Sequence, residues 1–285
     1  LYGIAIDAGK IDLDETIADL GIDDISTLSD TEKRARIEDL IMSRSGIYHP
    51  AAKETDGHRN TRPGRGSHSP GEHWWYNNWD FNLAGVIYEM KTAESIFLSF
   101  QRRIAEPLGM EDFGLEDTWY QWEREITEHP AYAFKLSARD RARFGQLFLQ
   151  NGKWNDEKIV PEHWVEKSTS SLTQFSEDRG YGYMWWSYYL QDDDGESHHV
   201  YAALGGSSQI IMVMPDSEAV FVYCGDSDYG KTADGADLWK LAGMISAART
   251  GQKAVEEPQL TDVSAIPYAY ANPEPKHYDE VELSP

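Results

Sequence analysis

The chain has 285 residues, enough for one large α/β enzyme domain or for a core with a smaller insertion. Its 26 basic residues against 49 acidic ones leave a net charge of −23, and this field repels phosphate backbones and anionic membranes, so nucleic-acid binding is not expected. Hydrophobic residues make up 40%, too many for a disordered acidic chain, so the charge is expected on the surface of a folded body. No run approaches the roughly 20 apolar residues that a membrane span needs.

The beginning of the chain has the pattern of a helix end. Residues Leu1 to Ile6 are mostly apolar and show no initiator Met, no capping residue and no signal-peptide pattern before Gly9. We therefore expect a fragment whose natural N-terminus, with any targeting signal, lies upstream of Leu1. The single Cys224 excludes an intrachain disulfide, and its place in an apolar run predicts a buried, inert thiol.

The middle of the chain, from about residue 30 to 170, is predicted to be mainly helical. Capping residues and apolar residues at helical spacing mark helices at about 30–45, 79–91, 93–106, 137–151 and just after Pro161. Between them, residues 49–71 are rich in Gly, Pro, His, Arg and Ser and almost free of apolar residues. This composition predicts a long surface loop, and loops of this length are usually functional or mobile.

After Gly180 the hydrophobic period changes from about 3.6 to 2, which predicts strands. The expected antiparallel meander has strands at 181–189, 200–204, 209–214 and 219–224, with turns at 192–195 and 215–217. A closing helix at 234–249 has four apolar residues on one face that could cover the sheet, namely Leu238, Leu241, Ile245 and Ala248. We take residues 1–250 as one domain and 251–285 as an acidic, proline-containing tail.

The sequence lacks the common nucleophile motifs, since neither Gly-x-Ser-x-Gly nor Ser-x-x-Lys occurs. Tyr76-Asn77-Asn78, placed after the loop and before a helix, offers other chemistry. A tyrosine beside a lysine can move a proton once its pKa is lowered, and the amide two residues on can hold a substrate carbonyl. The same tripeptide also fits a helix-capping asparagine beside a packed aromatic ring.

A second candidate element is Gly205-Gly206, within the segment 203–209 between two predicted strands. Residues without side chains let a substrate lie close to the backbone, and a free N–H there can donate to a developing oxyanion. The alternative is an ordinary bulge or hairpin turn.

Histidines and tryptophans are frequent around the long loop. The histidines could suggest zinc, but their spacing matches no helical ligand pair, so we expect no metal site among His49, His58, His68 and His73. The tryptophans could stack on a substrate or fill the core, and the candidates are Trp74, Trp75, Trp79, Trp185 and Trp186.

Taken in chain order, several segments resemble the serine beta-lactamase-related family, which includes class C beta-lactamases, family VIII esterases, D-aminopeptidases and aminohexanoate-oligomer hydrolases. The likeness covers residues 1 to about 250. The segments that carry it are Gly3–Asp14, Asp39–Gly46, Tyr76–Gly85, Ile104–Met110, Ser137–Asp140 and Gly180–Trp186. Each is weakly specific alone, but together and in this order they are strong.

The resemblance implies a penicillin-recognising α/β serine hydrolase fold. In it, an antiparallel sheet flanked by helices meets a mostly helical region, with the active site in the cleft between them; we expect the N-terminal strands of that sheet to be missing. It also implies two-step acyl transfer on a small-molecule ester or amide, without a cofactor. Tyr76 would shuttle the proton, Asn78 would position the substrate, and the Gly206 N–H, beside Gly205, would bind the oxyanion. The expected substrate contacts include Trp75, Trp185 and Trp186.

The chain departs from the family pattern in two places. The family's Ser-x-x-Lys should precede Leu1, so the nucleophile is expected upstream and the chain alone is expected to be inactive. Ala203-Leu204-Gly205 stands where relatives have Lys-Thr-Gly or His-Gly-Gly, which favours an esterase or amidohydrolase over a true beta-lactamase. The competing interpretation is a non-catalytic member that binds a peptide, glycan or cell-wall fragment. Many relatives are exported, which favours a periplasmic or secreted location; the oligomeric state stays open.

The loop at 49–71 leads directly into the Tyr76 motif, and we expect it to form a rim or lid over the site. Its three arginines, Arg59, Arg62 and Arg65, would then form a basic patch that favours an anionic or carboxylate-bearing substrate. The alternative is a solvated loop whose arginines pair with surface acids.

Overall fold

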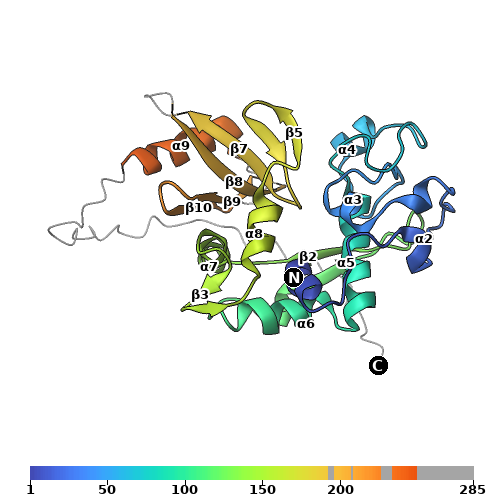
Figure 1. Cartoon of the computed structure of the whole chain (residues 1–285), viewed down its shortest axis with the longest axis horizontal. Coiled ribbons are helices and arrows are strands. Elements are labelled where there is room, and N and C mark those ends of the chain that lie inside the picture. The colour runs from blue at the N-terminus through green and yellow to red at the C-terminus, as the bar shows by residue number, and fades with distance from the viewer. Residues whose placement is uncertain (192–195, 207, 226–232, 249–285) are drawn as a thin grey trace, which may run out of the picture.

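The computed structural model describes residues 1–191, 196–206, 208–225 and 233–248. A mainly helical region and a region built on an antiparallel sheet lie next to each other (Figure 1). The predicted α/β architecture, with an antiparallel sheet flanked by helices, is thereby confirmed. The predicted turn at 192–195 and the predicted tail at 251–285 lie outside the described residues.

The helical region comes mainly from the first part of the chain. Its core surrounds α5, which buries Trp79, Leu83 and Ile87 completely. The helices are α1 (Tyr2–Asp7), α2 (Ile17–Leu20), a 3₁₀ turn (Glu32–Arg34), α3 (Ile37–Ile41), α4 (Asp56–Thr61), α5 (Asn78–Thr92), α6 (Ile96–Phe100), a π turn (Gln101–Ala105) and a second 3₁₀ turn (Leu115–Asp117).

The main sheet has six antiparallel strands in the order β10-β9-β8-β7-β6-β5. They are β5 (Thr173–Ser176), β6 (Arg179–Tyr181), β7 (Trp186–Gln191), β8 (Ser197–Gly205), β9 (Gln209–Met214) and β10 (Ala219–Tyr223). Two small sheets pair β1 (Thr118–Gln121) with β2 (Ala131–Phe134), and β3 (Lys153–Trp154) with β4 (Glu157–Lys158). The meander and its turn at 215–217 match the prediction, whereas β1 to β6 include strands that periodicity did not reveal.

Helices cover both faces of the main sheet (Figure 1). These helices are α7 (Ala138–Leu149), α8 (Glu162–Thr169) and α9 (Gly235–Ala247). Along β9 the side chains alternate, so that Met212 packs with α9 whereas Val213 joins the core formed with α7. The Ser137 side chain accepts a hydrogen bond from the Asp140 N–H and caps α7, as the sequence predicts.

Gly145 lets α7 approach the sheet closely. A Cβ at this position would lie 2.5 Å from Val220 Cγ1 and 3.1 Å from Ile211 Cγ2. In Gly145→Ala, the gain in helix propensity of about 1 kcal/mol is opposed by an overpacking cost of about 1–3 kcal/mol. We therefore expect a loss of up to about 2 kcal/mol in the free energy of unfolding, measured in urea.

The matched control lies on α9. A Cβ at Gly243 meets nothing within 4 Å, so Gly243→Ala should stabilise the protein by about 0.5–1 kcal/mol. Equal effects of the two substitutions would contradict close packing of α7 on the sheet.

The orientation of α9 differs from the prediction. Leu238 and Ala242, one turn apart, are buried against the sheet. Leu241 and Ile245, predicted on the covered face, are 42% and 46% exposed. The small Ala242 allows close contact with the sheet, and this rotates the larger residues outward.

The structure corrects three local predictions. The helix expected at 30–45 is interrupted because Ala35 accepts a hydrogen bond from the Ile17 N–H and Arg36 forms a bridge with Thr16. The loop at 49–71 contains α4, and its first residue, His49, is buried. Cys224 follows the end of β10 and is exposed rather than buried. In the described part of the chain, no helix is both long and apolar enough to span a bilayer.

Candidate active site

Tyr76 lies where the helical region meets the sheet. It precedes α5 by two residues, and its ring stacks on Trp186 of β7, with centroids 5.9 Å apart and an interplanar angle of 20°. Trp74 extends the contact to the sheet edge, at 4.5 Å from Phe175 of β5 and 5.5 Å from Tyr181 of β6. We call these five residues, Trp74, Tyr76, Phe175, Tyr181 and Trp186, the Tyr76 cluster.

The Tyr76 hydroxyl forms no hydrogen bond with the described residues, although the ring itself is half-buried. Burial raises the pKa of Tyr76 above its ordinary value. No described cation lowers it. The phenol is therefore protonated at neutral pH in this chain, and it needs a nearby positive charge before it can act as a base.

The start of α5 uses the two asparagines for different purposes. Asn77 is buried and caps the helix, because its Oδ1 accepts a hydrogen bond from the Trp79 N–H at 3.1 Å. Asn78, the predicted substrate-positioning residue, donates from Nδ2 to the Lys53 carbonyl at 3.1 Å. The capping interpretation thus applies to Asn77, and Asn78 joins the helix to the loop at 49–71.

Asp80 stabilises the start of α5 by accepting hydrogen bonds. It is completely buried, and its Oδ1 accepts hydrogen bonds from Ser45 Oγ at 2.6 Å and from Asn77 Nδ2 at 2.9 Å. Burial raises the pKa of Asp80 well above its ordinary value. The Asn77-x-x-Asp80 spacing, that of an N-cap and N3 pair, is a sequence signal that could have identified it.

Gly205 and Gly206 lie at the end of β8 and in the turn that follows. Both are exposed, and a Cβ at Gly206 would meet nothing within 4 Å. Ala202 pairs with Trp186, so the two glycines lie beyond the start of β7, toward the sheet end that carries Trp186. This is the hairpin turn weighed as the alternative, and its backbone is open to a ligand.

The loop at 49–71 reaches the Tyr76 cluster through α4. The His58 ring lies 5.4 Å from the Tyr76 ring and 6.3 Å from the Trp75 ring. Trp75 also meets Tyr48 edge-on at 6.0 Å, so it belongs to the loop side of the site. The loop therefore lies beside Tyr76, and its role as a rim or lid stays a prediction.

The three arginines of this loop do not form a free basic patch. Arg59 pairs with Asp56 at 3.2 Å, Arg62 with Glu54 at 2.9 Å and Arg65 with Glu32 at 2.8 Å. Their charges are already compensated by acids. The alternative of paired arginines therefore holds, except that two of the acids, Glu32 and Glu54, are buried rather than on the surface.

Trp185 and Trp186 have different surroundings in the structure. Trp186 belongs to the Tyr76 cluster, whereas Trp185 is 6% exposed and packs in the core against Phe148 at 4.7 Å and Tyr201 at 5.3 Å. Consecutive residues at a strand start point to opposite sides, so only one of the pair can reach the site. The predicted substrate contact of Trp185 is thereby corrected.

A serine–histidine contact elsewhere has no access to substrate. Ser187 Oγ and His199 Nε2 lie 2.9 Å apart between β7 and β8, but Ser187 is completely buried. Ser67 Oγ lies 3.0 Å from His68 Nδ1 on the exposed loop. The described residues also contain no group of three or more His, Cys, Asp or Glu that could hold a metal ion.

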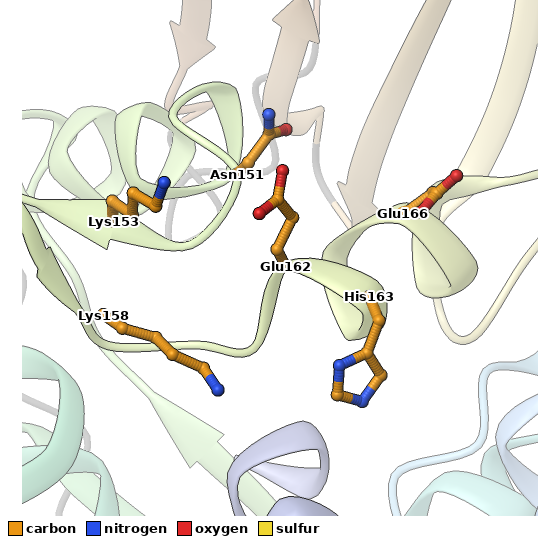
Figure 2. Close-up of a pocket in the computed structure, with 6 residues that line it drawn as sticks. All are labelled: Asn151, Lys153, Lys158, Glu162, His163 and Glu166. Atoms are coloured by element: carbon orange, nitrogen blue, oxygen red, sulfur yellow. The ribbon is translucent and has the colours of Figure 1, made fainter.

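A pocket of about 450 Å³ lies away from the Tyr76 cluster, between the end of α7, the β3–β4 hairpin and α8. In Figure 2 the Glu162 carboxylate points toward Asn151, whereas Lys158 and His163 point away from it. Its lysines and glutamates balance in charge, and no predicted site residue lines it. The residues that form it are Asn151, Lys153, Lys158, Glu162, His163 and Glu166.

The family to which this architecture belongs is shown by comparison with known proteins. The family model described as Beta-lactamase matches residues 2–244. The chain therefore belongs to the Beta-lactamase family. No curated protein matches the sequence.

Solved structures show the same fold at low sequence identity. A putative 6-aminohexanoate-dimer hydrolase from Bacillus anthracis superposes with a TM-score of 0.61 at 19% identity, covering 86% of this chain and 68% of the other. The octameric penicillin-binding protein homologue from Pyrococcus abyssi superposes with a TM-score of 0.59 at 19% identity, covering 87% of this chain and 64% of the other. A class C beta-lactamase superposes with a TM-score of 0.59 at 14% identity, covering 88% of this chain and 79% of the other.

Proposed function

We propose that the complete protein is a serine hydrolase that cleaves a small-molecule ester or amide through an acyl-enzyme. The observation that carries the proposal is the Tyr76 hydroxyl, which has no described hydrogen-bond partner at the junction of the two regions in a member of this family. A serine of a Ser-x-x-Lys motif upstream of Leu1 attacks the carbonyl, and water later releases the acyl group.

Tyr76 is assigned the proton transfer. In the first step it takes the proton of the attacking serine, and it then returns a proton to the leaving group as that bond breaks. The raised pKa of Tyr76 in this chain makes a cation necessary, and the lysine of the upstream motif supplies it. Asn78 orients the substrate carbonyl, and the exposed Gly206 N–H donates to the oxyanion.

An esterase or amidohydrolase fits better than a true beta-lactamase. The strand β8 ends in Ala203-Leu204-Gly205, which provides no cationic or imidazole side chain where the family pattern has one. Without such a group, binding and proton transfer depend on Tyr76 and on backbone donors. This favours substrates whose leaving group needs little stabilisation, such as activated esters.

Fluorophosphonate labelling tests the nucleophile. A longer chain that includes the residues upstream of Leu1 should form one covalent adduct, and mass spectrometry should place it on the upstream serine. Residues 1–285 alone should form none, because no described serine combines exposure with an activated partner at the Tyr76 cluster. Replacing the upstream serine by Ala is the control.

The competing function is a non-catalytic member that binds a peptide, glycan or cell-wall fragment. The aromatic surface around Tyr76, together with apolar Ala203 and Leu204, favours it. A longer chain that binds such a ligand and forms no fluorophosphonate adduct would establish this alternative and refute the hydrolase.

A further inference from the structure

Buried polar atoms without a hydrogen-bond partner gather around the Tyr76 cluster. Seven such atoms occur among the described residues, and five of them belong to this neighbourhood. Unsatisfied buried groups are rare in folded proteins, so each of them needs a physical explanation. The five are Ser43 Oγ, Arg44 Nε, His58 Nδ1, Trp74 Nε1 and Asp80 Oδ2.

Arg44 is the charged member of this group. Its guanidinium donates to two neutral acceptors, the Gly71 carbonyl and, at 3.5 Å, Thr173 Oγ1 of β5. It forms no ion pair with a carboxylate of the described residues, and its side chain is half-buried. His73, whose pKa is lowered by burial, by His68 and by the Arg44 charge, is a neutral neighbour.

Arg44 differs in this respect from the arginines of the adjoining loop. Acidic residues exceed basic ones by 23, and the arginines of the adjoining loop all have carboxylate partners. Removing a cation from water without a counter-charge is unfavourable, so an anion that reaches Arg44 recovers part of this cost. The planar fork of arginine fits a carboxylate in particular.

The surface beside Arg44 is aromatic. Thr173 is two residues from Phe175 along β5, and Phe175 packs against Trp74 at 4.5 Å. Trp74 in turn lies 6.5 Å from Tyr76. A ligand that extends from Arg44 toward Tyr76 therefore passes an apolar wall before it reaches the reacting group.

We propose that Arg44 binds the carboxylate of a ligand whose apolar part lies against Trp74 and Phe175, so that the enzyme prefers carboxylate-bearing esters or amides. The carboxylate subsite stands on the Arg44 contacts alone. Only the statement about substrate preference rests on the proposed hydrolase function.

The binding test uses residues 1–285 and two matched probes, phenylacetate and its neutral analogue phenylacetamide. By calorimetry, phenylacetate should bind at least about tenfold more tightly, because one charge-assisted bidentate contact contributes that much. Arg44→Gln should remove the preference and Arg44→Lys should retain part of it. Arg59→Gln, which removes the same charge from an exposed position nearby, should leave the preference unchanged.

Thermal unfolding of each variant shows whether it is folded. If Arg44→Gln does not fold, the comparison of the two probes on the wild-type protein still tests the carboxylate subsite. Equal affinity for both probes overturns the subsite, as does a folded Arg44→Gln that keeps the preference.

A second arm separates the two proposals. In the longer chain, the Michaelis constant for a monoester with a free carboxylate should be lower than for its neutral counterpart, and Arg44→Gln should abolish this difference. Ester hydrolysis without charge preference refutes the subsite and leaves the hydrolase intact. Arg44-dependent phenylacetate binding without any fluorophosphonate adduct refutes the hydrolase and leaves the subsite intact.

Discussion

Replacing Tyr76 by Phe in a chain that includes the upstream residues is expected to lower kcat for a nitrophenyl ester by about 10²-fold or more. The ring contacts with Trp186 and Trp74 remain, because phenylalanine keeps the stacked geometry and loses only the hydroxyl. The Michaelis constant should therefore change little. Steady-state kinetics would show an effect on turnover rather than on binding.

Tyr188→Phe provides the matched control. Tyr188 lies on β7 like Trp186, but its ring packs against Trp239 of α9 at 4.5 Å. This variant should keep wild-type turnover. If Tyr76→Phe retains full activity while the ester is still cleaved through an acyl-enzyme, Tyr76 is not the proton shuttle.

Glu32→Ala is expected to reduce the free energy of unfolding by about 3–5 kcal/mol, which corresponds to a fall of roughly 6–20 °C in the melting temperature. Glu32 is 3% exposed, and its carboxylate accepts hydrogen bonds from Arg65 at 2.8 and 3.0 Å and lies 3.2 Å from His49 Nε2. His49 is itself buried, and its Nδ1 already lacks a partner. Without Glu32, both ring nitrogens are buried and unsatisfied.

The contribution of Glu32 should also depend on pH. Burial alone raises the pKa of Glu32, but hydrogen bonds from Arg65 and Ser29 and the charge of His49 outweigh it and lower the pKa to about 2. A carboxyl with a lowered folded-state pKa stabilises the fold above its unfolded value of about 4.5, and this stability is lost as the pH falls toward 2.

The difference in stability between wild type and Glu32→Gln should therefore shrink on acidification, as urea unfolding at several pH values can measure. Asp112→Ala is the control, since Asp112 pairs with an Arg139 side chain that is 69% exposed. This substitution should lower the free energy of unfolding by less than about 1 kcal/mol. A constant difference from pH 7 to pH 3 would contradict the assigned role of the Glu32 charge.

Hydrophobic periodicity was sufficient to predict the long elements. The pattern around Leu147 and Phe148 indicated α7, because that helix buries one side. The apolar run at 209–214 indicated β9, which is buried on both faces of the sheet. The strands β1 and β2 have only four residues each, too few for a period to emerge, and they form by pairing Trp119 with Ala133 and Tyr120 with Tyr132. Such pairings depend on contacts that are distant in sequence.

The sequence offers candidate site residues where a motif is local. Tyr76 and Asn78 are separated by one residue, so their motif is visible in the sequence alone. The charge pattern of the loop was misleading, because Arg65 is compensated by Glu32, 33 residues away. Arg44 and His58 were missed for the same reason: their importance comes from which partners they lack or meet, and sequence alone does not show that.

The geometry of the Tyr76 cluster also gives the site an optical signature. Trp74 and Trp186 lie with ring centroids 5.5 Å apart at an interplanar angle of 71°, and each also contacts a further aromatic ring, Phe175 for Trp74 and Tyr181 for Trp186. Two indoles that are this close and crossed in a chiral arrangement couple their electronic transitions. We expect this coupling to contribute a paired positive and negative band to the near-ultraviolet circular dichroism, and a change in that band on addition of a ligand would report occupancy of the site without a label.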